Sequence, residues 1–482
     1  MDPIFDLAIA LPPRGSRQLL RGLHGQLKAA ILDGRLRSGI RLPATRTLAT
    51  ALEISRNTAV AAYDLLLSEG YLVGRPGAGT YVADVLSRQA RPKAPPGVPA
   101  TDRRLAAFWR QSRQAEAMGP RAPFAFDFRL GLPDSTVFPF HIWRRLSARA
   151  LRAFSRLPAA YGEAQGRPDL RESIARHISF ARAVACGAEG IVVTSGAQQA
   201  FDLLSRILVT AGRTVVAVEE PGYPPLRAAF AAAGAEVIGI PVDSEGLIVD
   251  RLPACARVIC VTPSHQFPLG TAMSQRRRAS LLGFARANGA VVIEDDYDGE
   301  FRFGGRPLDA LQTLDRAQSV FYVGTFSKSL FPALRLGFVV APLWARSALI
   351  AAHQIGDWHS MVLAQDTLAA FIQEGHLARH VRKMRRVYGR RRAILLEALS
   401  RHCGDRLQPI PAIAGLHLAA RLSGSMRATA LVRKATDAGI GIESLARYAA
   451  AGSAQNGLAF GYGTIDAERI DEGIRRLARA MG

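Results

Sequence analysis

Apolar residues recur at helical spacing through the first seventy positions and predict three short helices. The first begins at Ser16 and ends at Asp33-Gly34, and its apolar face consists of Leu19, Leu23, Leu27, Ala30 and Ile31. The second is expected over residues 45–52 and the third over residues 56–69. Only Glu53-Ile54 separates the second helix from the third. Two helices joined by so short a turn predict a helix-turn-helix.

The third predicted helix has the features of a recognition helix. Ser55 is a suitable N-cap and Gly70 a suitable stop. The apolar positions expected on its buried face are Val60, Tyr63, Leu66 and Leu67. The first turn is polar and can donate to phosphates and base edges through Ser55, Arg56, Asn57 and Thr58. Such a helix fits the width of a DNA major groove.

A β-hairpin is predicted directly after these helices. Residues 71–73 and 80–82 are short apolar or β-branched runs, and the glycine-rich segment 74–79 between them predicts a turn. Arg75 lies at the tip of this hairpin. Three helices followed by such a hairpin form a winged helix.

Beyond Phe124 the pattern changes to short apolar runs that alternate with helical stretches. The runs predicted as fully buried strands are residues 191–193, 215–218, 258–261, 291–293 and 320–323. Their spacing requires βαβ crossovers, so the fold class is α/β with a large, mostly parallel sheet. From about residue 365 a long Arg-rich helix to Ser400, and later a C-terminal helix, predict a smaller α+β lobe.

Residues 85–122 separate these two regions. This stretch is Pro-rich, poor in apolar residues and basic, which predicts an extended linker. Its positive charge suits DNA phosphates, and a merely solvated linker fits equally well. We therefore expect a winged helix over residues 16–84, a linker over 85–122 and an effector domain over 123–482.

The composition shows a large excess of positive charge, which a polyanionic partner would explain. Lys and Arg number 62 against 40 Asp and Glu, a net charge of +22, which favours binding to phosphates. A GC-rich genome would produce the same excess of arginine. The chain lacks a signal-like start and a long apolar run, which predicts a cytoplasmic protein without membrane contact. The four cysteines are scattered and predict no metal site.

Residues that could bind a ligand or react with it follow the predicted strands, at the sheet edge where ligands of open α/β sheets bind. Gly196 and Ala197 open a helix whose first N–H groups suit a phosphate. Asp295 and Tyr297 suit a pyridinium nitrogen and a phenolic oxygen. Lys328 is the residue type that forms a Schiff base with an aldehyde. Ser327 and Arg335 suit the phosphate, and Tyr223 suits stacking on a planar ring.

Each of these residues has an ordinary alternative role. Lys328 alone would be a surface lysine, Asp295 a helix cap and Tyr223 the edge of a core. Their succession at consecutive strand ends is what predicts one site that binds pyridoxal 5'-phosphate.

The N-terminal motifs RLPATRTLA, SRNTAVAAYDLL, EGYL and RPGAGTYVA resemble the GntR family of bacterial DNA-binding domains over residues 19–84. The resemblance implies DNA contacts by Arg46, Arg56, Thr58 and Gly77. A helical adaptor that does not bind DNA is the alternative.

The remainder, residues 126–482, resembles fold-type I aminotransferases. The motifs YGEAQGRPDLRESIARHI, VTSGAQQAFDLL, EEPGYPP, TPSHQFPLG, IEDDYDGEF and YVGTFSKSLFPALRLGFVVAP are similar in detail to the MocR/GabR regulators. The resemblance implies a pyridoxal phosphate Schiff base at Lys328, held by the strand-end residues above. It also implies that Tyr161 reaches the partner's site in a head-to-tail homodimer.

Two departures from the aminotransferase pattern concern the substrate. Ala459 stands where the family's carboxylate-binding Arg is expected, and Pro225 where some amino-acid-sensing members carry another Arg. In addition, Phe267 replaces the usual Asn before Pro268. These departures weaken the expectation of an amino-acid ligand, unless a different Arg of the chain or of its partner substitutes.

The sequence therefore predicts a regulator that binds promoter DNA and senses pyridoxal phosphate or an amine that condenses with it at Lys328. We expect at most residual transaminase activity. Two alternatives stay open: a working aminotransferase with an accessory DNA-binding domain, and an architectural DNA-binding protein that the cofactor only stabilises. Operator, effector and sign of regulation are not determined by the sequence.

Overall fold

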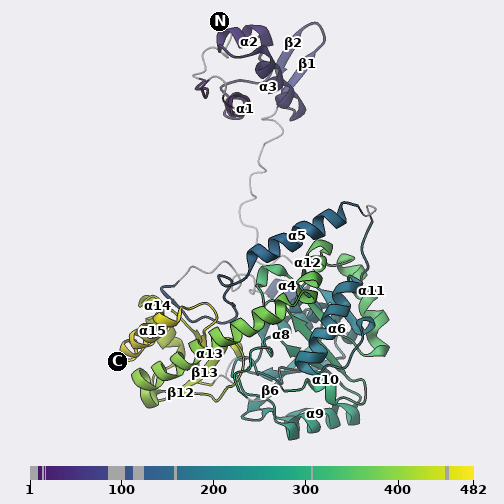
Figure 1. Cartoon of the computed structure of the whole chain (residues 1–482), viewed down its shortest axis with the longest axis vertical. Helices are drawn as coiled ribbons and strands as arrows, with labels where there is room; N and C mark the ends of the chain where they lie inside the picture. The colour runs from purple at the N-terminus through teal and green to yellow at the C-terminus, as the bar shows by residue number, and fades with distance from the viewer. Residues whose placement is uncertain are drawn as a thin grey trace. The chain divides into compact units, whose positions relative to one another are not determined.

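The computed structural model describes residues 9–13, 16, 18–84, 104–111, 124–156, 160–304, 308–450 and 455–482. They form two compact units, Met1–Leu105 and Ala106–Gly482, which are treated separately below (Figure 1). Most of the predicted linker 85–122 lies outside the described residues. Within it, the described part contains the short helix α4 (Ala107–Gln111).

The N-terminal unit is the predicted winged helix. Its elements are α1 (Leu19–Leu32), α2 (Thr45–Ala51), α3 (Arg56–Ser68), β1 (Leu72–Arg75) and β2 (Gly79–Val82). The three helices and the antiparallel hairpin enclose one apolar core. The helical apolar spacing therefore predicted these elements to within two or three residues.

The ends of α3 follow the local signals. The Ser55 hydroxyl accepts the N–H of Thr58 at 3.0 Å, as an N-cap does. Gly70 has a φ of +78°, which suits glycine at the end of a helix. The prediction that Val60 and Leu67 are buried was wrong, since both are only half-buried. The small side chains of Ala59 and Ala62 are fully buried on this helix instead.

The C-terminal unit is built on an eight-stranded sheet in the order β4-β11-β10-β9-β8-β5-β6-β7. The five predicted strands are confirmed as β4 (Ile191–Thr194), β5 (Val215–Glu220), β8 (Ala256–Val261), β9 (Val291–Asp296) and β10 (Val320–Thr325). Three further strands complete the sheet: β6 (Glu236–Asp243), β7 (Gly246–Leu247) and β11 (Gly337–Val340). β11 is antiparallel to both of its neighbours, and β10, β9, β8, β5 and β6 run parallel. The carboxyl ends of β4, β5, β8, β9 and β10 therefore lie at one edge.

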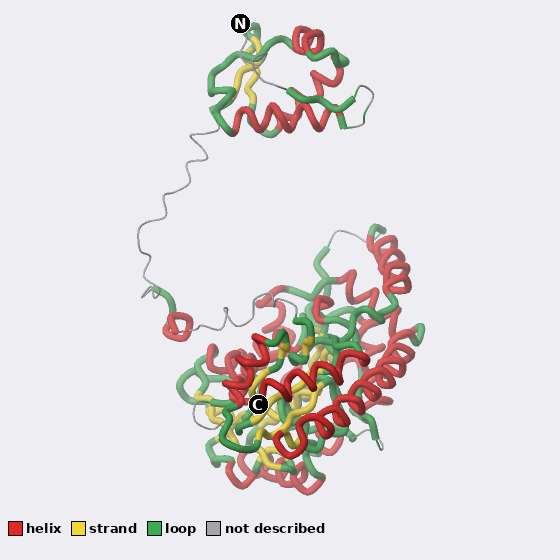
Figure 2. Tube along the Cα trace, turned by 90° about the vertical axis from the view of Figure 1, so that its left-hand side faces the viewer, coloured by secondary structure: helices red, strands yellow, loops and turns green. Residues whose placement is uncertain are grey.

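Helices cover both faces of this sheet, as Figure 2 shows by the strands enclosed between helices. On one face of the sheet, Val192 and Val339 share a core with three helices. These are α7 (Ala197–Leu208), α8 (Pro224–Ala232) and α11 (Arg346–Asp357). The neighbouring Val193 and Phe338 pack into the core of the other face. That face is covered by α5 (Phe140–Phe154), α6 (Pro168–Arg182), α12 (Val362–Gln373) and α13 (His376–Cys403). Two more helices, α9 (Gln275–Asn288) and α10 (Leu311–Leu314), belong to this unit.

The small lobe contains a four-stranded antiparallel sheet in the order β12-β13-β16-β15. Its elements are β12 (Leu407–Pro409), β13 (His417–Leu422), β15 (Glu443–Ser444), β16 (Gly457–Gly461), α14 (Ala428–Asp437) and α15 (Ala467–Met481). A segment far away in sequence joins it, because β3 (Phe126–Asp127) pairs in parallel with β14 (Ile440–Gly441). The sequence pattern did not indicate this pairing.

The predicted start of the small lobe at about residue 365 was wrong. The single Arg-rich helix is two helices, α12 and α13, separated at Gly375, whose φ is +72°. α12 packs against α5 and α6 of the large lobe, and in Figure 1 the long α13 leads from there to the small lobe.

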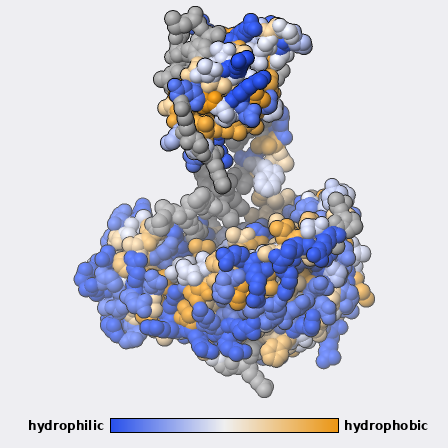
Figure 3. All heavy atoms as spheres, turned by 45° about the horizontal axis from the view of Figure 1, so that its top comes forward, coloured by the Kyte–Doolittle hydropathy of each residue, from blue (hydrophilic) through white to orange (hydrophobic). Residues whose placement is uncertain are grey.

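Apolar side chains are mostly interior, and the face seen in Figure 3 is predominantly hydrophilic with scattered apolar groups. In the described part of the chain, none of the helices combines the length and apolarity needed to cross a membrane.

Candidate cofactor and nucleic-acid sites

Lys328 lies at the carboxyl edge of the large sheet, three residues after the end of β10. Its Nζ donates to the carbonyl oxygen of Gly131 at 2.7 Å. Burial lowers the pKa of this amine, while the charges of Asp298 and Asp295 act in the opposite direction. A lysine with a lowered pKa is a better nucleophile at neutral pH.

Asp295 is the penultimate residue of the neighbouring strand β9 and is buried, with 6% of its surface exposed. Its Oδ1 has no hydrogen-bond partner among the described residues. Burial, together with the charges of Asp296 and Asp298, raises the pKa of Asp295 to about 8. An unpartnered buried carboxyl is unfavourable unless a positive group faces it. The pyridinium nitrogen of pyridoxal phosphate is such a group, so this residue fits the cofactor.

The predicted phosphate end lies where β4 meets α7. Gly196 is the N-cap of α7, with Ala197 as its first residue and a φ of +85° at the glycine. Arg335 donates to the carbonyl of Ser195 at 2.5 Å. A Cβ at position 196 would lie 3.0 Å from an Arg335 nitrogen, so the positive φ and this close approach both favour glycine here. Ser327 lies beside Thr325, whose hydroxyl is 3.0 Å away.

The three predicted tyrosines differ in their surroundings. Tyr297 donates to the carbonyl of His265 at 2.9 Å, and burial raises its pKa well above 10. Tyr223 is partly exposed and makes an edge contact with Phe267, 5.5 Å between ring centroids. Tyr161 is 74% exposed and stacks on Trp358. Phe267 contacts both Tyr223 and Tyr297, so these two rings lie close together at the sheet edge. Tyr161 lies on the surface.

Sequence reasoning missed four residues of this site. Gly131 holds the Lys328 amine, and Glu219, His265 and Asp298 are buried acids or bases close to the predicted residues. Burial raises the pKa of Glu219 to about 7, and one of its oxygens has no hydrogen-bond partner among the described residues. The strand-end rule that selected Tyr223 and Asp295 would have selected these three too. Gly131 carries no comparable signal.

Ala459, which stands where a carboxylate-binding Arg is expected, lies beside the acidic residue Glu443. In the small-lobe sheet Ala459 of β16 is paired with Ala419 on one side and with Glu443 on the other. Glu443 accepts the N–H of Leu130 at 3.0 Å and the hydroxyl of Tyr448 at 2.7 Å. A carboxylate ligand would meet an alanine and a glutamate there.

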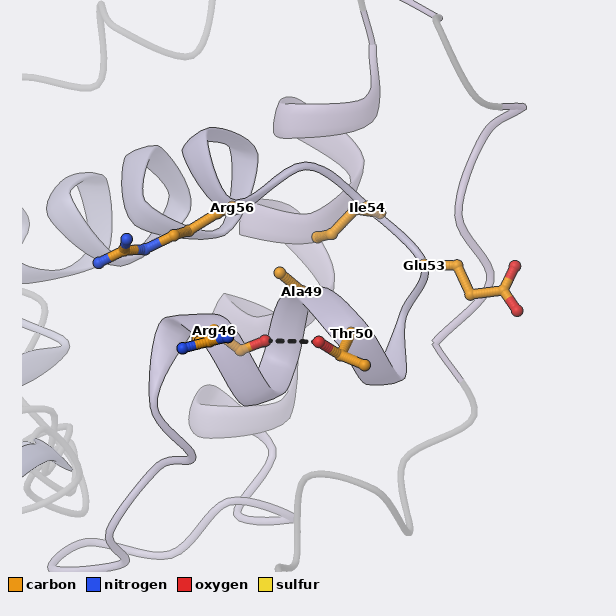
Figure 4. A pocket seen from close by; sticks show the side chains of 6 residues that line it. All are labelled: Arg46, Ala49, Thr50, Glu53, Ile54 and Arg56. Atoms are coloured by element: carbon orange, nitrogen blue, oxygen red, sulfur yellow. Dashed lines mark hydrogen bonds between the residues drawn. The ribbon is translucent and has the colours of Figure 1, made fainter.

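The residues predicted to contact nucleic acid border a cavity in the N-terminal unit. A cavity of about 420 Å³ lies between α2 and the start of α3, lined by Arg46, Ala49, Thr50, Glu53, Ile54 and Arg56. Figure 4 shows the two arginine side chains pointing to the same side, and Glu53 pointing to the opposite one. Ser55, Arg56 and Asn57 are exposed at the start of α3, and Thr58 is half-buried beside the Ser55 hydroxyl.

The hairpin provides a second basic point. Arg75 ends β1 and lies over the ring of Tyr81 at 4.5 Å. Gly77 lies in the turn with a φ of +72° and is exposed. The structure thus presents the turn residues of the wing to solvent.

Comparison with known proteins gives the class of both units. The model of bacterial regulatory proteins of the gntR family matches residues 21–82, and the model of aminotransferase class I and II matches residues 134–474. The probable rhizopine catabolism regulatory protein MocR of Rhizobium meliloti is 37% identical over 96% of this chain and 93% of its own length. The pyridoxine biosynthesis transcriptional regulator PdxR of Corynebacterium glutamicum is 32% identical over 97% of both chains.

The chain belongs to the MocR/GabR family of transcriptional regulators. It is accordingly a DNA-binding regulator that depends on pyridoxal phosphate. Among solved structures, LysN, the α-aminoadipate aminotransferase of Thermus thermophilus in complex with a phosphopyridoxyl-leucine, is 31% identical with a TM-score of 0.68. That likeness covers 74% of this chain and 92% of LysN. The fold class predicted from the sequence is confirmed.

Proposed function

We propose that this MocR/GabR family member binds promoter DNA through residues 16–84 and senses pyridoxal phosphate, or an amine that reacts with it, at Lys328. The observation that supports this most is the buried, unpartnered Asp295 oxygen next to a lysine of lowered pKa, in a chain whose other unit binds DNA. Residues 85–122 would link the two functions, and residues 123–482 would form the sensor.

The residues that would hold the cofactor divide by its parts. Asp295 faces the ring nitrogen, Tyr297 the phenolic oxygen and Tyr223 the ring. The phosphate is bound by Gly196, Ala197, Ser327 and Arg335, and the partner's copy of Tyr161 reaches the site in a head-to-tail homodimer. When bound, pyridoxal phosphate supplies an aldehyde that condenses with amines and a ring that withdraws electrons.

The protein's own groups prepare the lysine for this chemistry. Burial favours the neutral amine of Lys328, and the Gly131 carbonyl fixes its direction. Asp295, whose pKa is raised to about 8, is mostly protonated at neutral pH and gives up its proton more readily when a positive partner is present. These two residues therefore respond to occupancy of the site.

On the DNA side, the exposed start of α3 and the cavity beside it are suited to bases and phosphates. We assign major-groove contacts to Arg46, Ser55, Arg56, Asn57 and Thr58, and backbone contacts to Arg75 and Gly77 in the wing. Acting on promoters, the protein works in the cytoplasm, associated with the nucleoid when bound to DNA.

The effector is expected to lack the usual carboxylate contact. Ala459 itself offers a carboxylate no positive partner, and the neighbouring Arg447 lies 3.7 Å from Glu443, to which it is ion-paired. The effector is therefore expected to be pyridoxal phosphate itself, or an amine that the protein does not recognise through a carboxylate at this position. Ligand would change closure of the small lobe and so shift the population of DNA-binding states.

The decisive experiment compares promoter affinity of three forms of the full chain: free of cofactor, loaded with pyridoxal phosphate, and loaded then treated with a panel of amines, amino acids and ω-amino acids. We expect the forms to differ by at least severalfold, with no sustained keto-acid release. Identical affinities for all three would contradict the sensor. Multiple-turnover keto-acid formation would instead support an aminotransferase with an accessory DNA-binding domain.

A further inference from the structure

A buried group of polar side chains lies next to the cofactor residues and has no part in the assignments above. His265 and Asp298 are each 2% exposed, and His417 is 3% exposed. His265 follows β8, Asp298 follows β9, and His417 begins β13 of the small lobe. The group thus joins three elements at the site.

The hydrogen bonds of this group fix the direction of its protons. His265 Nδ1 lies 3.1 Å from both carboxyl oxygens of Asp298 and 3.0 Å from the Tyr297 hydroxyl. A carboxylate only accepts, so the contact with Asp298 selects the His265 tautomer that carries its proton on Nδ1. Asp298 also accepts the N–H of Leu416 at 3.2 Å. The Asp298 carboxyl is therefore held by contacts to His265 and to the backbone of Leu416.

Close packing holds the imidazole in this position. A Cβ on Gly415 would lie only 2.0 Å from His265 Cε1 and 2.6 Å from an Asp298 oxygen. The ring of His417 lies 4.5 Å from that of His265 and hydrogen-bonds the Pro268 carbonyl through Nε2 at 3.1 Å. His265 Nε2 itself has no hydrogen-bond partner among the described residues.

The charge of Asp298 acts on both cofactor residues. It favours the protonated form of Lys328, against the effect of burial, and it is one cause of the raised pKa of Asp295. The charged or titratable groups that interact with the pair include Tyr297, Tyr462, His417, Lys328 and Asp295. Of these, only Lys328 can carry a positive charge close to neutral pH, because burial and His265 hold the pKa of His417 well below its usual range.

We propose that His265 and Asp298 form a positioning pair for the cofactor site, in which His265 holds the Asp298 carboxyl in place and orients Tyr297, and Asp298 balances the charge of Lys328. The inference rests on the proposed role of Lys328 and adds the control of its protonation. Through Leu416 and His417 the same pair contacts the small lobe.

The test measures the protonation of Lys328 directly, in cofactor-free full-length protein. The rate of Lys328 acetylation by acetic anhydride is followed against pH, with the modified peptide quantified by mass spectrometry. We expect Asp298→Asn and His265→Leu each to lower the apparent pKa of Lys328 by about one unit. His265→Asn retains a donor at the position of Nδ1 and should restore a value close to that of the unmodified protein.

His417→Gln is the matched control, since it keeps the donor to Pro268 and changes a neighbouring buried imidazole. An unchanged Lys328 pKa in folded Asp298→Asn and His265→Leu would overturn the proposal, and so would an equal shift in the control. The labelling needs neither DNA nor cofactor, so its outcome is independent of the promoter experiment.

A metal ion is the competing explanation of the group. The ligand atoms of His265, Asp298 and His417 lie within 4.8 Å of one another. Stoichiometric metal in the purified full chain, measured by elemental analysis and lost in His417→Gln, would overturn the positioning pair.

Discussion

At the scale of single residues, the site contains several buried acids whose negative charges would repel one another. Asp295, Glu219 and Glu294 are buried, and burial is the first cause of the raised pKa of each. Glu294 is satisfied by the N–H groups of Leu311 and Gln312. Asp295 and Glu219, in contrast, each leave one oxygen without a hydrogen bond in the described structure. The unsatisfied acids are those nearest the cofactor position.

This arrangement predicts a pH dependence of stability in the cofactor-free protein. The pKa of Asp295 rises from 3.8 to about 8 on folding, so its contribution to stability is full below about pH 4 and is lost as the pH rises through 8. Asp295→Asn should therefore melt several degrees above the unmodified protein at pH 8, with a much smaller difference at pH 4.

Thermal denaturation across this range checks the prediction. Glu219→Gln is the control, because the lower pKa of Glu219, about 7, should place its effect at lower pH. With pyridoxal phosphate bound, the order should reverse. A cofactor-free Asn variant that is less stable than the unmodified protein at pH 8 would contradict this account of Asp295.

At the scale of elements, α3 shows how local sequence places a functional surface. Its N-cap fixes the first turn, and its apolar side packs into the core of the winged helix. Arg56 remains exposed beside the cavity that it shares with α2. We expect exposed side chains of this kind to contribute to DNA binding and not to the stability of the fold.

Arg56→Ala should accordingly weaken promoter binding while leaving the unfolding transition unchanged. Loss of one phosphate contact lowers the slope of log K against log salt by about 1. Loss of a base contact costs about 1–3 kcal/mol. Titration of labelled promoter DNA at several salt concentrations distinguishes the two.

Arg276→Ala removes an exposed arginine of the other unit and is the matched control for charge. If both variants bind alike, net charge rather than the helix-turn-helix determines affinity.

At the scale of the whole molecule, one chain combines a DNA-binding unit with an aminotransferase-type unit. Relatives that share this order along nearly their whole length are named as transcriptional regulators. Two aminotransferases among the similar proteins match only 73% and 74% of this chain. The combination therefore suggests that occupancy of one unit controls the other.

Lys328→Ala tests this coupling. The variant should bind promoter DNA as the cofactor-free protein does, and pyridoxal phosphate or amines should no longer change its affinity. Affinity is measured with and without each ligand, and near-ultraviolet circular dichroism verifies the fold. A folded variant that regulates normally would show that the cofactor only stabilises the protein.

The sequence by itself determined the winged helix, five strands of the large sheet and much of the candidate site. Helical periodicity and caps are local, so α1 to α3 were predictable from neighbouring residues. Buried parallel strands appear as continuous apolar runs, and their carboxyl ends meet at one edge, so Asp295 and Lys328 could be placed together before the structure was known.

Only the tertiary structure decided contacts between distant segments. The Gly131 carbonyl meets the Lys328 amine across 197 residues of sequence, and β3 pairs with β14 more than 300 residues later. Asp298 and His265 were visible in the motifs, but their mutual hydrogen bonds were not. Periodicity records which face of an element is buried and not which partner covers it, so such contacts depend on packing of the complete chain.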